Sequence, residues 1–134
     1  MTVEGPLPRA RKVALVREIL LAYVHVRWLL RRHDLPTALE RLRRVPAAAA
    51  AAAAPTDEKL ARAVRLTLSR LPADSRCLMQ SLVLTRLLAR RGREATVVIG
   101  VEPRGTFTAH AWVERRGTPL LPPGDHEGGR LAEL

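Results

Sequence analysis

A single cysteine at the start of a predicted helix is the residue of this sequence best suited to chemistry. Cys77 follows Asp74 and Ser75, either of which can cap a helix by accepting its first free N–H groups, and an apolar pattern then continues to Leu88. Cys77 therefore falls in the first turn, at the positive end of the helix dipole, where a thiolate is favoured. This position suits a cysteine nucleophile.

A histidine within a predicted strand is the best candidate for the base that such a nucleophile needs. Residues 106–115 alternate like a half-buried strand, and His110 lies there between two alanines that leave room for a substrate backbone. The remaining histidines are weaker candidates. His25 is inside an amphipathic helix, His33 is next to a helix break and His126 is in a polar tail.

A third group should orient the imidazole and fix its tautomer. The sequence contains no asparagine, which excludes a Cys-His-Asn triad and leaves a carboxylate for this role. If residues 115–118 form a hairpin turn, residue 110 pairs near residue 123, and Asp125 comes within reach of His110. Glu114 is the alternative, but four residues of strand separate it from His110 by about 13 Å. Asp125 is therefore favoured.

The oxyanion of a tetrahedral intermediate needs fixed hydrogen-bond donors. The backbone N–H of Cys77, at a helix N-terminus, is one natural donor. Gln80 lies one turn later on the same helical face and is a candidate for the second. Gln80 is equally well interpreted as a solvated helix residue.

Length and cysteine content limit the class of protein. The chain has 134 residues, about the size of one domain, and its lone cysteine excludes an internal disulfide. One cysteine also argues against a zinc site built on paired cysteines and fits a cytoplasmic protein. No run of about 18 apolar residues predicts a membrane span. Arg17 and Glu18 interrupt the apolar run that a signal peptide would require.

The net charge of +10 comes almost entirely from arginine, since Lys12 and Lys59 are the only lysines. Such a bias can indicate a polyanionic partner. The arginines are spread over nearly every segment, however, which favours a GC-rich genome as the cause. Aromatic residues make up 3% of the chain, too few for stacking on single-stranded bases, so we expect no nucleic-acid partner.

The hydrophobic pattern predicts helices first and a small antiparallel sheet afterwards, which is an α+β fold. We expect helices at residues 9–30, 37–44, 56–71 and 77–90, and strands at residues 95–101, 106–115 and 118–121. The expected organisation is an N-terminal helical segment at 1–46, an alanine-rich linker at 47–55 and a catalytic core at 56–134, together forming one compact unit.

Local signals set several boundaries. Residues 33–36 should break the first helix, Thr56 should cap the third and Gly92 should end the fourth. The first helix has apolar residues at helical spacing: Val13, Val16, Leu20, Tyr23, Val24 and Trp28.

The series of motifs from about residue 71 to residue 124 resembles the leader peptidases of lasso-peptide biosynthesis, which are transglutaminase-like cysteine proteases. The resemblance is carried by CLMQSLVL at 77–84, RLL at 86–88 with Gly92, VIGV at 98–101 and AHAWVE at 109–114 with Gly117. The amphipathic segment at 23–30 also looks like the N-terminal part of that family.

This resemblance implies that Cys77 is the nucleophile and His110 the base. The family often has a carboxylate about twelve residues after the histidine, but Pro122 occupies that position here, so Asp125 is the local substitute. The family removes the leader of a ribosomal precursor peptide, without a cofactor or metal. A separate leader-recognition protein is the implied partner, and an ATP-dependent lasso cyclase then acts on the freed core peptide.

Two further hypotheses remain open. The same scaffold can transfer the acyl group to an amine, as true transglutaminases do, and the acyl-enzyme is common to both reactions. The chain can also be a non-catalytic basic module, in which case Cys77 is dispensable and binding falls steeply with salt.

Overall fold

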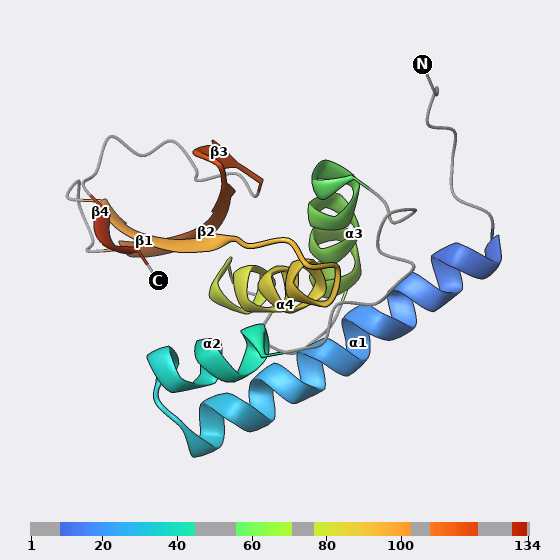
Figure 1. Ribbon diagram of the computed structural model, residues 1–134, viewed down its shortest axis with the longest axis horizontal. Coiled ribbons are helices and arrows are strands. Elements are labelled where there is room, and N and C mark those ends of the chain that lie inside the picture. Colours follow the sequence, from blue (N-terminus) through green and yellow to red (C-terminus); the bar gives the residue numbers. More distant parts are fainter. Residues whose placement is uncertain (1–8, 45–55, 71–76, 103–107, 121–129, 134) are drawn as a thin grey trace.

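Four helices pack on one side of a small antiparallel sheet in the computed structural model (Figure 1), which confirms the predicted α+β class. The structure describes residues 9–44, 56–70, 77–102, 108–120 and 130–133. The helices are α1 (Arg9–Arg32), α2 (Leu35–Arg43), α3 (Asp57–Ser69) and α4 (Cys77–Arg90). The alanine run at 47–54 and the predicted caps Asp74 and Ser75 lie outside the described residues.

The sheet has the order β3-β2-β1-β4 and all of its neighbouring strands are antiparallel. Its strands are β1 (Thr96–Glu102), β2 (Thr108–Arg115), β3 (Thr118–Pro119) and β4 (Arg130–Glu133). The predicted hairpin turn is confirmed, because Arg115 pairs with Thr118 across Arg116 and Gly117. β3 is shorter than the predicted strand at 118–121, and residue 123, expected to pair near residue 110, lies outside the described residues. Both turn residues have positive φ, 52° and 79°, as a tight two-residue hairpin requires. β4 was not predicted.

Helix α4 is the central element of the fold. It lies between the sheet and the other helices (Figure 1) and contacts α1, α2, α3, β1 and β2. Its apolar residues are therefore buried nearly all round, and Leu82, Val83, Leu84, Leu87 and Leu88 are 0% exposed. The helix ends as predicted at Gly92, whose φ of 68° is the left-handed conformation of a helix C-cap glycine.

The break between the first two helices covers only residues 33–34, whereas the sequence predicted a break over residues 33–36. Asp34 caps α2, since its Oδ1 accepts the Thr37 N–H at 3.2 Å, and Leu35 and Pro36 lie inside the first turn. Proline is tolerated there because its missing N–H has no partner at a helix start. Thr56 caps α3 as predicted, accepting the Lys59 N–H at 3.3 Å.

Most of the apolar residues at helical spacing that the sequence analysis picked out in the first helix lie on the exposed side of α1. Val13, Val24 and Trp28 are 69%, 63% and 48% exposed, and of the six named residues only Tyr23 is buried. The core-facing residues are the neighbouring stripe of Leu15, Ile19, Ala22, Tyr23, Val26 and Leu29. None of the helices in the described part of the chain is long and apolar enough to cross a membrane.

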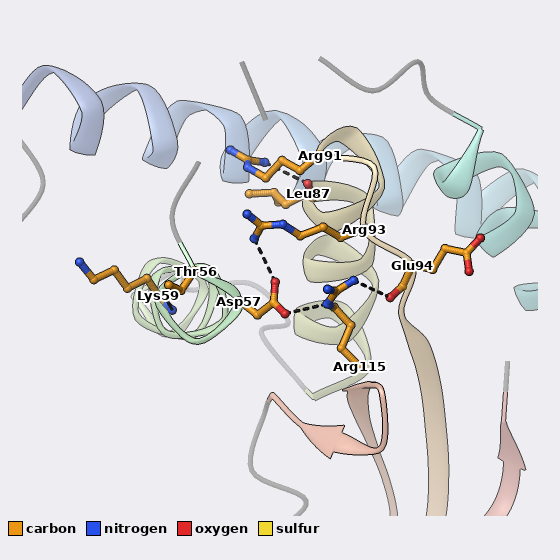
Figure 2. A network of polar contacts seen from close by, with 8 residues as sticks. All are labelled: Thr56, Asp57, Lys59, Leu87, Arg91, Arg93, Glu94 and Arg115. Carbon is orange, nitrogen blue, oxygen red and sulfur yellow. Dashed lines mark hydrogen bonds and ion pairs between the residues drawn. The ribbon is translucent and has the colours of Figure 1, made fainter. Parts of the chain in front are cut away.

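Two ion-pair clusters fasten the helices to their surroundings. Asp57, at the start of α3, binds Arg93 at 2.9 Å and Arg115 at 2.6 Å, and Arg115 also donates to the Glu94 carbonyl at 3.3 Å (Figure 2). This cluster joins α3 to the entry of β1 and to the end of β2. The second cluster also lies at the C-terminal end of α4, where Glu18 of α1 accepts from Arg90 at 3.1 Å and from Arg91 at 2.8 Å.

Candidate active site

The nucleophile candidate is the first residue of the central helix. α4 begins at Cys77, as the sequence predicted, and the side chain is half-buried. Because the first four N–H groups of a helix have no partner within the helix, the thiol lies beside the positive end of the α4 dipole. Reactive cysteines of proteins are often found in this position.

The first turn of α4 is held by side chains that the sequence analysis did not single out. Ser81 is 0% exposed, and its hydroxyl donates to the Cys77 carbonyl at 2.7 Å. Thr85 repeats the contact one turn later, donating to the Ser81 carbonyl at 2.8 Å. Their spacing of four residues along the helix is the signal that could have identified them, since hydroxyls bond to carbonyls at that distance. The two contacts fix the backbone that carries Cys77.

The sulfur of Cys77 reaches the strand that carries the histidine candidate. The backbone N–H of Ala111, which follows His110 in β2, donates to Cys77 Sγ at 3.3 Å. This hydrogen bond fixes the position of the sulfur relative to β2. The contact brings residues 34 positions apart in the sequence to one place.

The shortness of β3 makes this contact possible. Leu120 N–H donates to the Val113 carbonyl at 2.8 Å, so the backbone groups of Val113 point to the β3 edge of β2. Ala111 lies two residues earlier and points its N–H to the same edge. β3 ends at Pro119, which pairs with Glu114, and so does not extend alongside Ala111. The sulfur accepts an N–H that a longer β3 would have taken.

The structure places the backbone of His110 in β2, where it pairs with Gly100 of β1. The position is one residue from the N–H that contacts Cys77 Sγ. A strand residue opposite a glycine, next to two alanines, has small neighbours along and across the sheet. The predicted pairing of a helix-start thiol with a strand-borne histidine is thus compatible with the backbone geometry.

Glu114 has a structural partner of its own. Glu114 is 8% exposed, and its carboxylate accepts the indole N–H of Trp112 at 2.8 Å. β2 continues unbroken from Thr108 to Arg115, so Glu114 remains about 13 Å along the strand from His110. The spacing of two residues, which places Trp112 and Glu114 on the same face of the strand, is the sequence signal for their contact. Asp125 and His126 lie outside the described residues.

His25, on α1, lies near the second half of α4 and not near the thiol at its start. Burial, and then the nearby Arg86 guanidinium, lower the pKa of His25 below its usual 6.5. Arg86 is nine residues after Cys77, which corresponds to about 13 Å along the helix axis. The structure therefore brings His25 to the opposite half of α4 and does not bring it to Cys77.

The oxyanion candidates lie together at the start of α4. Gln80 is half-buried and follows Cys77 by three residues, so both belong to the first helical turn. A backbone N–H such as that of Cys77 and a side-chain amide such as that of Gln80 are the types of donor that stabilise a developing oxyanion. No group of three His, Cys, Asp or Glu side chains that could hold a metal occurs among the described residues.

The comparison with known families agrees with this arrangement. Residues 20–131 match the family described as the transglutaminase-like superfamily, a span that contains Cys77, His110 and all of the described sheet except its last two residues. No curated protein and no solved structure gives a significant match. Because the family match covers most of the sequence, the chain belongs to the transglutaminase-like superfamily.

Proposed function

We propose that the chain is a cysteine peptidase that removes the leader from a ribosomally made lasso-peptide precursor. The observation that carries the catalytic part is the contact between Cys77 Sγ and the Ala111 N–H, beside His110. The lasso-peptide substrate is supported by the motif series around CLMQSLVL and AHAWVE. The location is the cytoplasm, where a lone thiol stays reduced.

In the proposed first half-reaction, the imidazole of His110 takes the proton of the Cys77 thiol, and the thiolate attacks the scissile carbonyl carbon. A carbon–sulfur bond forms while the carbonyl π electrons move to oxygen. The oxyanion is stabilised by the Cys77 N–H and the Gln80 amide. The imidazolium then gives its proton to the leaving amine as the carbon–nitrogen bond breaks, which leaves a thioester.

In the second half-reaction, His110 takes a proton from water, and the hydroxide attacks the thioester carbon. The carbon–sulfur bond breaks, the leader departs with a new carboxylate, and the proton returns to the thiolate. Asp125 is the proposed positioning residue, which holds the imidazole in the correct tautomer. Neither a cofactor nor a metal takes part.

The proposed partners follow from the same substrate. A separate leader-recognition protein presents the leader to the peptidase, and an ATP-dependent lasso cyclase closes the ring on the released core peptide. The test is incubation of the chain with a candidate precursor and its recognition protein, with intact mass as the readout. We expect a leader and a core that sum to the precursor plus one water, and no cleavage by Cys77→Ala protein.

Acyl transfer to an amine is the second candidate, because membership of the transglutaminase-like superfamily supports it directly. The thioester intermediate is the same, but an amine replaces water in the second half-reaction. The mass readout distinguishes the two reactions. A product joined to an added primary amine, with loss of ammonia from a glutamine side chain or with loss of the core peptide from the leader, would indicate transfer.

A further inference from the structure

An apolar groove of about 860 Å³ opens between the first half of α1 and the outer side of α3. Its apolar lining comes from Leu15, Val16 and Leu20 of α1 and from Ala63 and Leu66 of α3. We call it the α1–α3 groove. Cys77 is not part of the lining, so the groove is separate from the candidate active site.

The groove exposes more apolar surface than the fold requires. Val16, Leu20 and Leu66 are 41%, 37% and 46% exposed, although each belongs to a helix whose other side is buried in the core. Val13, one turn from the groove residues on α1, is 69% exposed. Each buried Å² of apolar surface gains roughly 25 cal/mol, so covering such a patch is favourable. Contiguous exposed apolar surface of this kind marks an interaction site.

The rim of the groove is positively charged. Lys12 from α1 and Lys59, Arg62 and Arg70 from α3 and its C-cap line it together with the apolar residues, and no carboxylate occurs among the described lining residues.

Two of the three acidic residues on α1 and α3 form ion pairs with arginines that do not line the groove. Glu18 binds Arg90 and Arg91 of the α4 end, and Asp57 binds Arg93 and Arg115. The third, Glu58, is exposed and is not part of the groove lining. Among the described residues, no carboxylate of α1 or α3 lies in the groove lining, so carboxylates of a bound molecule would complement the charges of Lys12, Arg62 and Arg70.

The dimensions of the groove fit a short helix. Eight residues separate Lys12 from Leu20, about 12 Å of helix, and eleven separate Lys59 from Arg70, about 16 Å. This length accommodates two to three turns of an amphipathic helix, the binding mode in which apolar side chains enter a groove between helices. Flanking carboxylates on that helix would meet the basic rim.

We propose that the α1–α3 groove binds an acidic amphipathic helix of a partner protein. A second copy of this chain is a poor occupant, because the protein has a net charge of +10 and the rim would meet its own sign. A lipid surface also fits less well, because a concave groove between two helices cannot be filled by a flat bilayer. The proposal goes beyond the peptidase reaction and does not depend on it.

The test uses a fluorescent synthetic peptide of about 18 residues, long enough to form a helix, with leucine on one face and glutamate on the other. Fluorescence anisotropy of this peptide is titrated with the full chain. We expect saturable binding that weakens with salt. A matched peptide with lysine in place of glutamate should bind at least about tenfold more weakly, because it meets the rim with like charge.

Variants on α3 locate the binding surface. Arg62→Glu and Leu66→Asp should each weaken binding of the acidic peptide by about tenfold. Arg65→Glu is the matched control, because Arg65 is exposed on the same helix and does not line the groove. It should change the affinity by less than about twofold. Circular dichroism verifies that each variant is folded.

Several results would overturn the proposal. Equal weakening by Arg62→Glu and Arg65→Glu would mean that only the overall charge of the chain attracts the peptide. Binding to phosphatidylserine vesicles without peptide binding would assign the surface to a membrane. Dimerisation that Leu66→Asp abolishes would assign it to a second copy. Cys77→Ala protein should bind the peptide normally, so failure of the peptidase proposal leaves this result unaffected.

Discussion

Cys77 Sγ accepts a 3.3 Å hydrogen bond from the backbone N–H of Ala111, the residue after His110. The contact joins the first turn of α4 to the β3-facing edge of β2. The thiol thus lies both at the N-terminus of a helix and beside the strand that carries the proposed base. The catalytic proposal rests on this relationship.

Glu114 should matter for stability more than for catalysis. Glu114→Ala removes the acceptor of a buried indole N–H, and we expect a loss of about 1–3 kcal/mol in the free energy of unfolding. Glu114→Gln retains an acceptor for Trp112 and should lose less. Chemical denaturation measures both. If Glu114→Gln abolished cleavage while the fold remained intact, Glu114 rather than Asp125 would be the orienting carboxylate.

Asp125 is expected to support the base without replacing it. Asp125→Ala should slow cleavage by less than His110→Ala does, because a thiolate–imidazolium pair can partly form without the carboxylate. Asp125→Asn keeps the shape and hydrogen bonding of the side chain and should retain more activity than Asp125→Ala. Initial rates of leader removal provide the comparison. Wild-type rates in both variants would exclude Asp125 from the site.

The Asp57 cluster should be a stabilising link between α3 and the sheet. Asp57→Ala leaves the half-buried Arg93 and Arg115 without their shared carboxylate, and we expect a loss of about 1–3 kcal/mol. Glu58→Ala is the control, since it removes the neighbouring exposed carboxylate of the same helical turn. Thermal unfolding of both variants tests the difference. Equal melting temperatures would mean that the cluster contributes nothing.

The lowered pKa of His25 predicts a pH dependence of stability. The unfolded chain takes up a proton at this histidine near pH 6.5, whereas burial and Arg86 keep the folded chain unprotonated to lower pH. The free energy of unfolding should therefore fall as the pH decreases below 6.5. His25→Gln removes this titration, and its stability should change less between pH 7 and pH 5. Parallel curves for the two proteins would contradict this.

Helix boundaries were predictable because local contacts set them. Thr56 caps α3 through a bond to a residue three positions later, and Gly92 ends α4 with its own backbone conformation. The start of α4 at Cys77 also agrees with the prediction, although its predicted caps, Asp74 and Ser75, lie outside the described residues. The position of Asp34 as the cap of α2 was missed, because Pro36 was interpreted as a helix breaker instead of a first-turn residue.

Features that depend on distant parts of the chain were harder to predict. β4 has no strand pattern of its own and exists by pairing with β1, including an irregular register between Ile99 and Gly100. The buried side of α1 was ambiguous, since apolar residues occur on two adjacent stripes of the helix. α4 covers one of them in the folded chain, and the other stays exposed.

The central claim is that His110 activates Cys77, and alkylation tests it without knowledge of the substrate. Cys77 is the only cysteine of the chain, so intact mass reports its modification by iodoacetamide unambiguously. At pH 7, we expect His110→Ala to slow the labelling by about tenfold, because an unassisted thiol is only a few per cent thiolate. His126→Ala should label at the wild-type rate. Equal rates in all three proteins would contradict the account.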